Sequence, residues 1–382
     1  MLRMLKHKKV LALLVAVLAW NVPISAKAKK AQKTQVPAVE VTGSAPVVLW
    51  RNPTDIATRD LFFGPGGKKH EPHGPFTFVE EDMDGTNPKF VVHDEDGVKW
   101  KVKMGNEARP ETVASRLVWA AGYTANEDYF VGELHVEGMP AHLRRGQNLV
   151  KAGTVHNVRL KRHLKGEEKA GEWHWRDNPF RGNRELNGLR VMMALINNWD
   201  LKDENNAIYR QKKPAKEAAK DGGAKDGDGK DGAGKDGDGT ADGAADRAGE
   251  SGPEMIYVIS DLGASFGPNG IRRTHALSKD NFEAYKRSKF ITGKTDEYVD
   301  FGTPGRPTFL EIFNPHEYFM RSGLRWIGHR IPRADARWMG QVLAQLSPSQ
   351  IREAFRAAGY SPQEIEGFAT VVQDRIAQLN RL

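Results

Sequence analysis

Two short polar segments constrain the fold of this chain most. A long insert between them hides how few other residues separate them in the sequence. The first, residues 200–205, reads Asp-Leu-Lys-Asp-Glu-Asn and separates an apolar run with helical spacing from a strand-like Ala-Ile-Tyr. The second, Asp-Leu-Gly at 261–263, ends an apolar β-like run. Residues 211–254 between them are mainly Lys, Asp, Gly and Ala, which predicts a disordered insert. Without these 44 residues the offset between Asn205 and Asp261 falls from 56 to 12, the length of a short hairpin.

The N-terminus predicts export. Residues 1–28 have the layout of a secretory signal peptide, with four basic residues before an apolar run from Val10 to Trp20 and a small-residue cleavage site at Ala26-Lys-Ala28. That run is too short to cross a bilayer of about 30 Å. We therefore expect no transmembrane span after cleavage, a flexible leader over residues 29–45, and a periplasmic or extracellular location. An uncleaved anchor or a buried helix is the alternative.

Composition excludes several classes of function. The formal net charge is +8, but residues 1–28 carry five basic and no acidic side chains, so the charge after cleavage is +3. This small charge gives no support to nucleic-acid binding. The chain has no cysteine, which excludes disulfides, thiol catalysis and Cys-ligated zinc.

The region 46–165 is expected to be rich in β-strands. Strand-like runs cover residues 75–81, 90–94, 98–104, 128–136 and 155–163, with an Asp-Gly hairpin signal at 96–97. In the third run Lys99, Lys101 and Lys103 share one face by alternation. Such a face is usually solvated, but Lys103, at the end of the strand, is the candidate for contact with a nucleotide's phosphates.

A helix is expected over residues 109–122, because Pro and Glu occupy its first turn and Gly122 ends it. Glu111 in that turn is the candidate partner of Lys103, and Glu107 is its rival. An acidic residue that only complements the helix dipole is the alternative interpretation.

The region 166–382 is expected to be helical. Helical patterns cover residues 183–197, 314–327, 333–346, 349–358 and 361–382, and the last two follow Ser-Pro starts. The tripeptide Asp300-Phe-Gly302 lies far from Asn205 and precedes a Pro- and Gly-rich stretch, so we interpret it as a loop.

Taken together, these segments resemble the bilobal protein-kinase-like fold, an α+β class with a β-rich N-lobe and a helical C-lobe. The string at 200–205 differs from the kinase loop Asp-Leu-Lys-Pro-Glu-Asn at one position. Gly85-Thr-Asn-Pro-Lys89 and Trp100-Lys-Val-Lys103 are similar to the arrangement in HipA-type and other atypical kinases. Two features depart from the usual pattern: Asn197-Asn-Trp199 stands before the Asp, and the first loop is not GxGxxG.

The resemblance implies a role for each matching residue. Lys103 would contact the α- and β-phosphates of ATP or another nucleotide, and Glu111 would orient it. Asp200 would be the base and Lys202 would contact the γ-phosphate. Mg²⁺ would be held by Asn205 and Asp261. The backbone from Gly85 to Lys89 would cover the phosphates, and a nucleotide base would lie near a crossover at 158–164, where the sequence offers no specific marker.

Three functions fit these expectations. The first is an exported, Mg-nucleotide-dependent phosphotransferase acting on a hydroxyl of a protein or glycan. The second is a catalytically silent kinase-fold binding or scaffold protein of the cell envelope, since ATP is scarce outside the cytoplasm. The third is a secreted α+β protein whose motif matches arise by chance.

Overall fold

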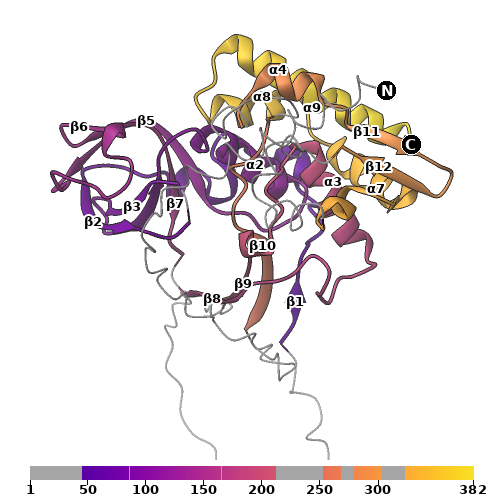
Figure 1. Ribbon diagram of the computed structural model, residues 1–382, viewed down its shortest axis with the longest axis horizontal. Helices are drawn as coiled ribbons and strands as arrows, with labels where there is room; N and C mark the ends of the chain where they lie inside the picture. The colour runs from indigo at the N-terminus through magenta and orange to yellow at the C-terminus, as the bar shows by residue number, and fades with distance from the viewer. Residues whose placement is uncertain (1–44, 86, 165, 212–252, 268–278, 303–322) are drawn as a thin grey trace, which may run out of the picture. The chain divides into compact units, whose positions relative to one another are not determined.

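The computed structural model describes residues 45–85, 87–164, 166–211, 253–267, 279–302 and 323–382 (Figure 1). The predicted signal peptide lies outside these residues, as do most of the leader, most of the insert and most of the helix predicted over 314–327. Among the described helices, none is long and apolar enough to cross a membrane.

A sheet closed on itself forms the strand-rich region (Figure 1). The strands follow the order β4-β3-β2-β5-β7, and β4 also pairs with β7, which closes the ring. All of these pairings are antiparallel except the short one between β2 and β5. The strands are β2 (Phe76–Asp82), β3 (Lys89–His93), β4 (Lys99–Lys103), β5 (Asp128–Glu137) and β7 (Thr154–Arg162), with β6 (Val150–Lys151) at the edge of β7.

Alternation along these strands separates an apolar inner face from a basic outer face. The inner face holds a core that includes Trp100 and Val102. On the outer face, cross-strand register places Lys103 of β4 directly between Lys89 of β3 and Arg159 of β7. The expected shared lysine face is therefore present. Lys103, the last residue of β4, is buried, whereas Lys99 at the start of the strand is exposed.

Helix α2 (Ala108–Ala120) packs beside β5 and β7 and against helix α8 (Pro348–Arg356). Eleven of its 13 residues are buried, so it is covered by protein on both sides. Its Arg116 guanidinium donates to the backbone carbonyls of Phe62 and Asp128, which ties the helix to the preceding loop and to β5. These contacts hold the middle of α2 in place beside β5.

A second sheet has the order β1-β10-β9-β8. Its strands are β1 (Val47–Val48), β8 (Glu167–Gly171), β9 (Asn206–Gln211) and β10 (Glu254–Ile259). The two central strands are antiparallel, and their register pairs Asn206 with Ile259 and Gln211 with Glu254. The predicted hairpin is thus confirmed, and residues 212–253 connect its two strands from Gln211 to Glu254.

Replacing residues 212–253 with a two-residue Asn-Gly turn should leave the fold intact, because Gln211 and Glu254 are already cross-strand partners. Closing a shorter loop costs less entropy, so we expect about 2 kcal/mol of added stability and a rise of several degrees in Tm. Differential scanning fluorimetry measures this. A Gly/Ser linker of the native length is the matched control and should leave Tm unchanged. A large fall in Tm with the short turn would mean that the insert contributes to the folded core.

Helices dominate the C-terminal region, as expected. They are α3 (Arg184–Leu195), α4 (Phe282–Arg287), α7 (Arg333–Leu343), α8 and α9 (Pro362–Asn380). The two predicted Ser-Pro starts are confirmed, since Ser347 and Ser361 each form a capping box with the residue three positions on. Single 3-10 turns span Ile56–Thr58 (η1), Gly64–Gly66 (η2), Lys68–His70 (η3), Gln147–Leu149 (η4), Asp203–Asn205 (η5) and Arg325–Gly328 (η7).

The prediction of a loop at Asp300-Phe-Gly302 is wrong. Strand β12 (Tyr298–Phe301) runs through it and lies between β11 (Ile291–Lys294) and β13 (Ile331–Pro332). Val299 and Phe301 alternate into the helical core, while the carboxylate of Asp300 accepts from the backbone amide of Arg330 at 2.7 Å. Only four residues alternate here, which is too few for a clear sequence signal, and the proline-rich stretch that follows obscured it.

Candidate active site

Lys103 is the centre of the candidate site. Its ammonium lies 2.8 Å from Glu111 Oε2, 3.1 Å from Glu107 Oε2 and 3.2 Å from Asp261 Oδ1. Burial alone would lower the pKa of Lys103, but the carboxylates of Asp261, Glu111 and Glu107 together raise it above its usual value. The lysine is therefore a cation at neutral pH, and it joins β4, the start of α2 and the segment after β10.

Glu111 lies between two cations. One carboxylate oxygen contacts Lys103, and the other lies 2.9 Å from Arg159 Nη2. Arg159 in turn lies 3.6 Å from Asp128 Oδ1, and all of these side chains are almost completely buried. Arg159 was not a candidate from the sequence, because only the pairing of β7 with β4 places it beside Lys103.

Glu107, the rival of Glu111, also contacts Lys103, so the structure contains both pairs. Its carboxylate accepts from the Asn87 amide in the turn between β2 and β3 and forms an ion pair with Lys279. Glu107 thus links that turn, Lys103 and the C-terminal region. Neither Asn87 nor Lys279 carried a recognisable signal in the sequence.

Asp261 is held as a carboxylate. Its Oδ1 accepts from the Gly263 backbone amide at 3.1 Å and contacts Lys103. Burial would raise the pKa of Asp261, but Lys103 and the Gly263 amide hold it well below its usual range. The side chain is 39% exposed, so part of the carboxylate faces solvent.

Gly263 is required by close packing against Glu107. A Cβ atom at position 263 would lie 2.7 Å from both Cβ and Oε2 of Glu107, well inside contact distance. Gly263→Ala should therefore push Glu107 away from Lys103 and cost about 1–3 kcal/mol, measured by urea denaturation. Gly132→Ala is the matched control, because a Cβ there meets nothing within 4 Å. Equal stability of the two variants would contradict this packing.

The 200–205 loop is held by its own side chains. The Asn205 amide nitrogen donates to the Asp200 carbonyl at 2.6 Å, and the Asp200 backbone amide donates to Asn198 Oδ1 at 2.9 Å. Lys202 Nζ lies 3.6 Å from Asp200 Oδ1. Asp203, which stands where kinases have proline, accepts from the Trp175 backbone amide at 3.0 Å. Asn198 and Asp203 were not candidates, yet both fix the backbone around Asp200.

Asn205 and Asp261 are brought together by the hairpin. Both the backbone amide and the hydroxyl of Ser260 donate to the Asn205 carbonyl, at 2.8 and 3.0 Å. Ser260 immediately precedes Asp261, so the two predicted metal ligands are tied through one residue. Because the Asn205 amide nitrogen already faces Asp200, its Oδ1 is the atom that remains for a cation.

The other predicted residues are Gly85, in the turn between β2 and β3, and Lys89, which begins β3. Arg145 braces this turn: its guanidinium donates to the carbonyls of Gly85 and Asp82. Gly85 has φ +63°, which favours glycine. Lys89 is half-buried beside Lys103, and burial lowers its pKa. Arg145 was not a candidate from the sequence.

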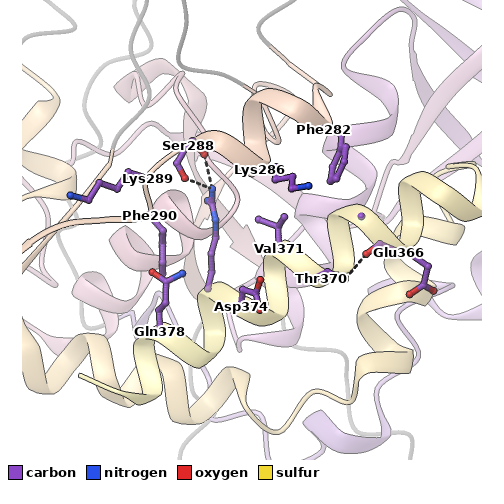
Figure 2. Close-up of a pocket in the computed structure, with 12 residues that line it drawn as sticks. Phe282, Lys286, Ser288, Lys289, Phe290, Glu366, Thr370, Val371, Asp374 and Gln378 are labelled. Atoms are coloured by element: carbon purple, nitrogen blue, oxygen red, sulfur yellow. Dashed lines mark hydrogen bonds between the residues drawn. The ribbon is translucent and has the colours of Figure 1, made fainter.

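A concavity of about 720 Å³ lies between α4 and α9 and is less suited to catalysis than the site around Lys103 (Figure 2). Its Arg375 is almost completely buried and donates to Ser288 Oγ and to the carbonyls of Ala194 and Leu195. The guanidinium therefore holds helix α3 in place.

The topology and these contacts define a fold of the α+β class, with a strand-rich N-terminal region and a helical C-terminal region. Both parts of the predicted fold class are confirmed. The chain matches no protein-family model and no curated protein. Among solved structures it is similar to the Helicobacter pylori proinflammatory kinase CtkA, with a TM-score of 0.38 and 11% identity over 80% of this chain and 95% of that chain. A likeness of this degree carries no argument about activity.

Proposed function

We propose that this protein is a Mg-nucleotide-dependent phosphotransferase that phosphorylates a hydroxyl group on a protein or glycan. The observation that carries the proposal is the convergence of Glu111 and Asp261 on Lys103, at 2.8 and 3.2 Å. Asp261 follows Ser260, which donates to the Asn205 carbonyl in the loop that holds Asp200. A chance match of short motifs would not bring residues so far apart in sequence into contact. Export, an atypical HipA-type character and the absence of a nucleic-acid partner are parts of the same proposal.

Each side chain has a distinct task in this proposal. Lys103 binds the phosphates next to the scissile bond, and Glu111, itself held by Arg159, orients it. The Gly85–Lys89 turn lies over the phosphates, braced by Arg145. Asp200 accepts the proton of the attacking hydroxyl, and Lys202 beside it offers a positive charge to the transferred group.

Magnesium fits the ligands that Asn205 and Asp261 offer. An amide oxygen and an ionised carboxylate are the oxygen donors that Mg²⁺ prefers. The Asn205 amide nitrogen is engaged by Asp200, and the pKa of Asp261, which burial would raise, is held low by Lys103, so both groups present oxygen. When bound, the ion would neutralise charge on the phosphate oxygens.

The test is nucleotide-induced stabilisation of the mature protein. Ligand at 100 times its Kd should add about 2.7 kcal/mol of stability, seen as a rise of several degrees in Tm that requires Mg²⁺. Asp261→Asn should abolish the Mg²⁺-dependent part. Asp296→Asn is the control, because Asp296 is fully exposed. Absence of a shift with ATP, GTP, CTP and UTP would overturn the proposal. Nucleotide binding without phosphate transfer to protein or glycan acceptors would favour the silent binding protein.

A further inference from the structure

A polar concavity of about 530 Å³ lies near Lys103, between the outer face of the closed sheet and the paired strands β8 and β9. Its lining includes Lys101, Lys161, Glu167 and Tyr209, and we call it the Lys161 pocket. Lys101 and Lys161 are cross-strand partners, as are Lys103 and Arg159 two residues further along the same strands. Two residues of strand span roughly 6.6 Å. A ligand with phosphates at Lys103 would therefore place its other end in this pocket.

Two backbone amides next to the pocket already donate hydrogen bonds to backbone carbonyls. At the end of β7, the amide of Arg162 donates to the Glu127 carbonyl at 3.0 Å, and the amide of His163 donates to the Lys99 carbonyl at 2.9 Å. These two amides are not available to a ligand. Side chains must therefore supply much of the recognition in the pocket.

Lys161 and Glu167 are the two groups suited to this task. Lys101 is neutralised by Asp82 at 2.7 Å, whereas among the described residues no carboxylate lies within 4.0 Å of the Lys161 ammonium. Glu167 likewise has no ion pair with a described residue. Burial lowers the pKa of Lys161 and raises the pKa of Glu167, as expected for charges withdrawn from water without a close partner.

An aromatic ring completes the pocket. The Lys161 ammonium lies 5.7 Å from the centre of the Tyr209 ring, and Tyr209 belongs to the strand paired with that of Glu167. A flat ligand at Tyr209 would share the pocket with a donor, the Lys161 ammonium, and an acceptor, the Glu167 carboxylate. The pocket thus has the three elements needed to recognise a heterocyclic base.

We propose that the Lys161 pocket binds guanine, with Lys161 donating to O6 or N7 and Glu167 accepting from the N1 and 2-amino groups. Guanine offers two acceptors on one edge and two adjacent donors on another, which matches one ammonium and one carboxylate. Adenine presents the acceptor N1 where the carboxylate would need a donor. This inference rests on the proposed function, because it names the nucleotide that the phosphotransferase uses.

Nucleotide Kd values, measured by isothermal titration calorimetry on the mature protein with Mg²⁺, test the inference. GTP should bind roughly tenfold more tightly than ATP, since one bidentate base contact discriminates by about that factor or more. ITP lacks the 2-amino group, so its Kd should lie between those of GTP and ATP. Glu167→Gln should remove most of the difference between GTP and ITP. Lys161→Met should weaken both nucleotides while leaving their ratio unchanged.

Glu168→Gln is the matched control, because Glu168 is the exposed neighbour of Glu167 on the same strand, and it should change none of these ratios. ATP binding as tightly as GTP, or an unchanged GTP/ITP ratio in Glu167→Gln, would overturn the guanine inference and leave the phosphotransferase proposal standing. If none of these nucleotides binds, both fail together.

Discussion

Asp200→Asn should lower the rate of phosphate transfer by a factor of roughly 10² to 10⁴, the usual contribution of a general base. Nucleotide binding should survive, because the loop is held through the backbone of residue 200. Its amide donates to Asn198 and its carbonyl accepts from Asn205, and neither contact involves the carboxylate. The comparison requires two measurements on one preparation, transfer of labelled phosphate and the Mg²⁺-dependent shift in Tm.

Glu204→Gln is the matched control for that experiment. Glu204 lies in the same short loop, carries the same charge and is exposed. It should keep transfer within about twofold, as expected of a surface substitution. If Asp200→Asn transfers phosphate at the native rate, another group is the base and the assignment of Asp200 is wrong. If it loses nucleotide binding as well, the side chain is structural.

The parts of the site that sequence predicted are those set by local patterns. Alternation in β4 placed Lys103 on the lysine face, and the start of α2 offered Glu111 and Glu107 as candidates. The hairpin between Asn205 and Asp261 followed from removing a segment that cannot form a core. Each inference used residues within one element or between neighbouring elements, where period and turn chemistry are informative.

The parts that sequence missed depend on contacts between distant segments. Arg159 lies beside Lys103 only because β7 pairs with β4, although 56 residues separate the two. Lys279 reaches Glu107 from the C-terminal region, and Arg145 reaches the turn at Gly85 from another loop. A basic residue in a strand or loop gives no local signal of its partner. The same limit applies to β12, which forms because Phe301 is buried by the helical core.

Lys103→Met should have the largest effect on stability. It removes a cation that contacts Glu107, Glu111 and Asp261 together, and methionine fills a similar volume without charge. Removing one partner of a buried ion pair typically costs 3–5 kcal/mol, and we expect a loss of about that size in the free energy of unfolding. Lys99→Met is the control, because Lys99 shares the strand face but is 43% exposed and 3.5 Å from Glu80. It should cost less than about 1 kcal/mol.

The pH dependence separates lost charge from lost packing. In the native protein the lowered pKa of Asp261, held down by Lys103 against the effect of burial, stabilises the fold above the unfolded value of about 3.9, and this contribution is lost as pH falls towards the folded pKa. The raised pKa of Lys103 stabilises the fold below the unfolded value of about 10.4 and is lost only as pH rises through the folded pKa. In the variant, burial without the Lys103 charge raises the pKa values of these carboxylates, so they gain protons at a higher pH than in the native protein. The cost of Lys103→Met should therefore be largest near neutral pH and shrink below about pH 5. Adding Asp261→Asn should recover part of the loss at pH 7, because it removes a charge left without its partner. A cost that is equal at pH 4.5 and pH 7, with no recovery in the double variant, would mean that Lys103 acts through packing alone.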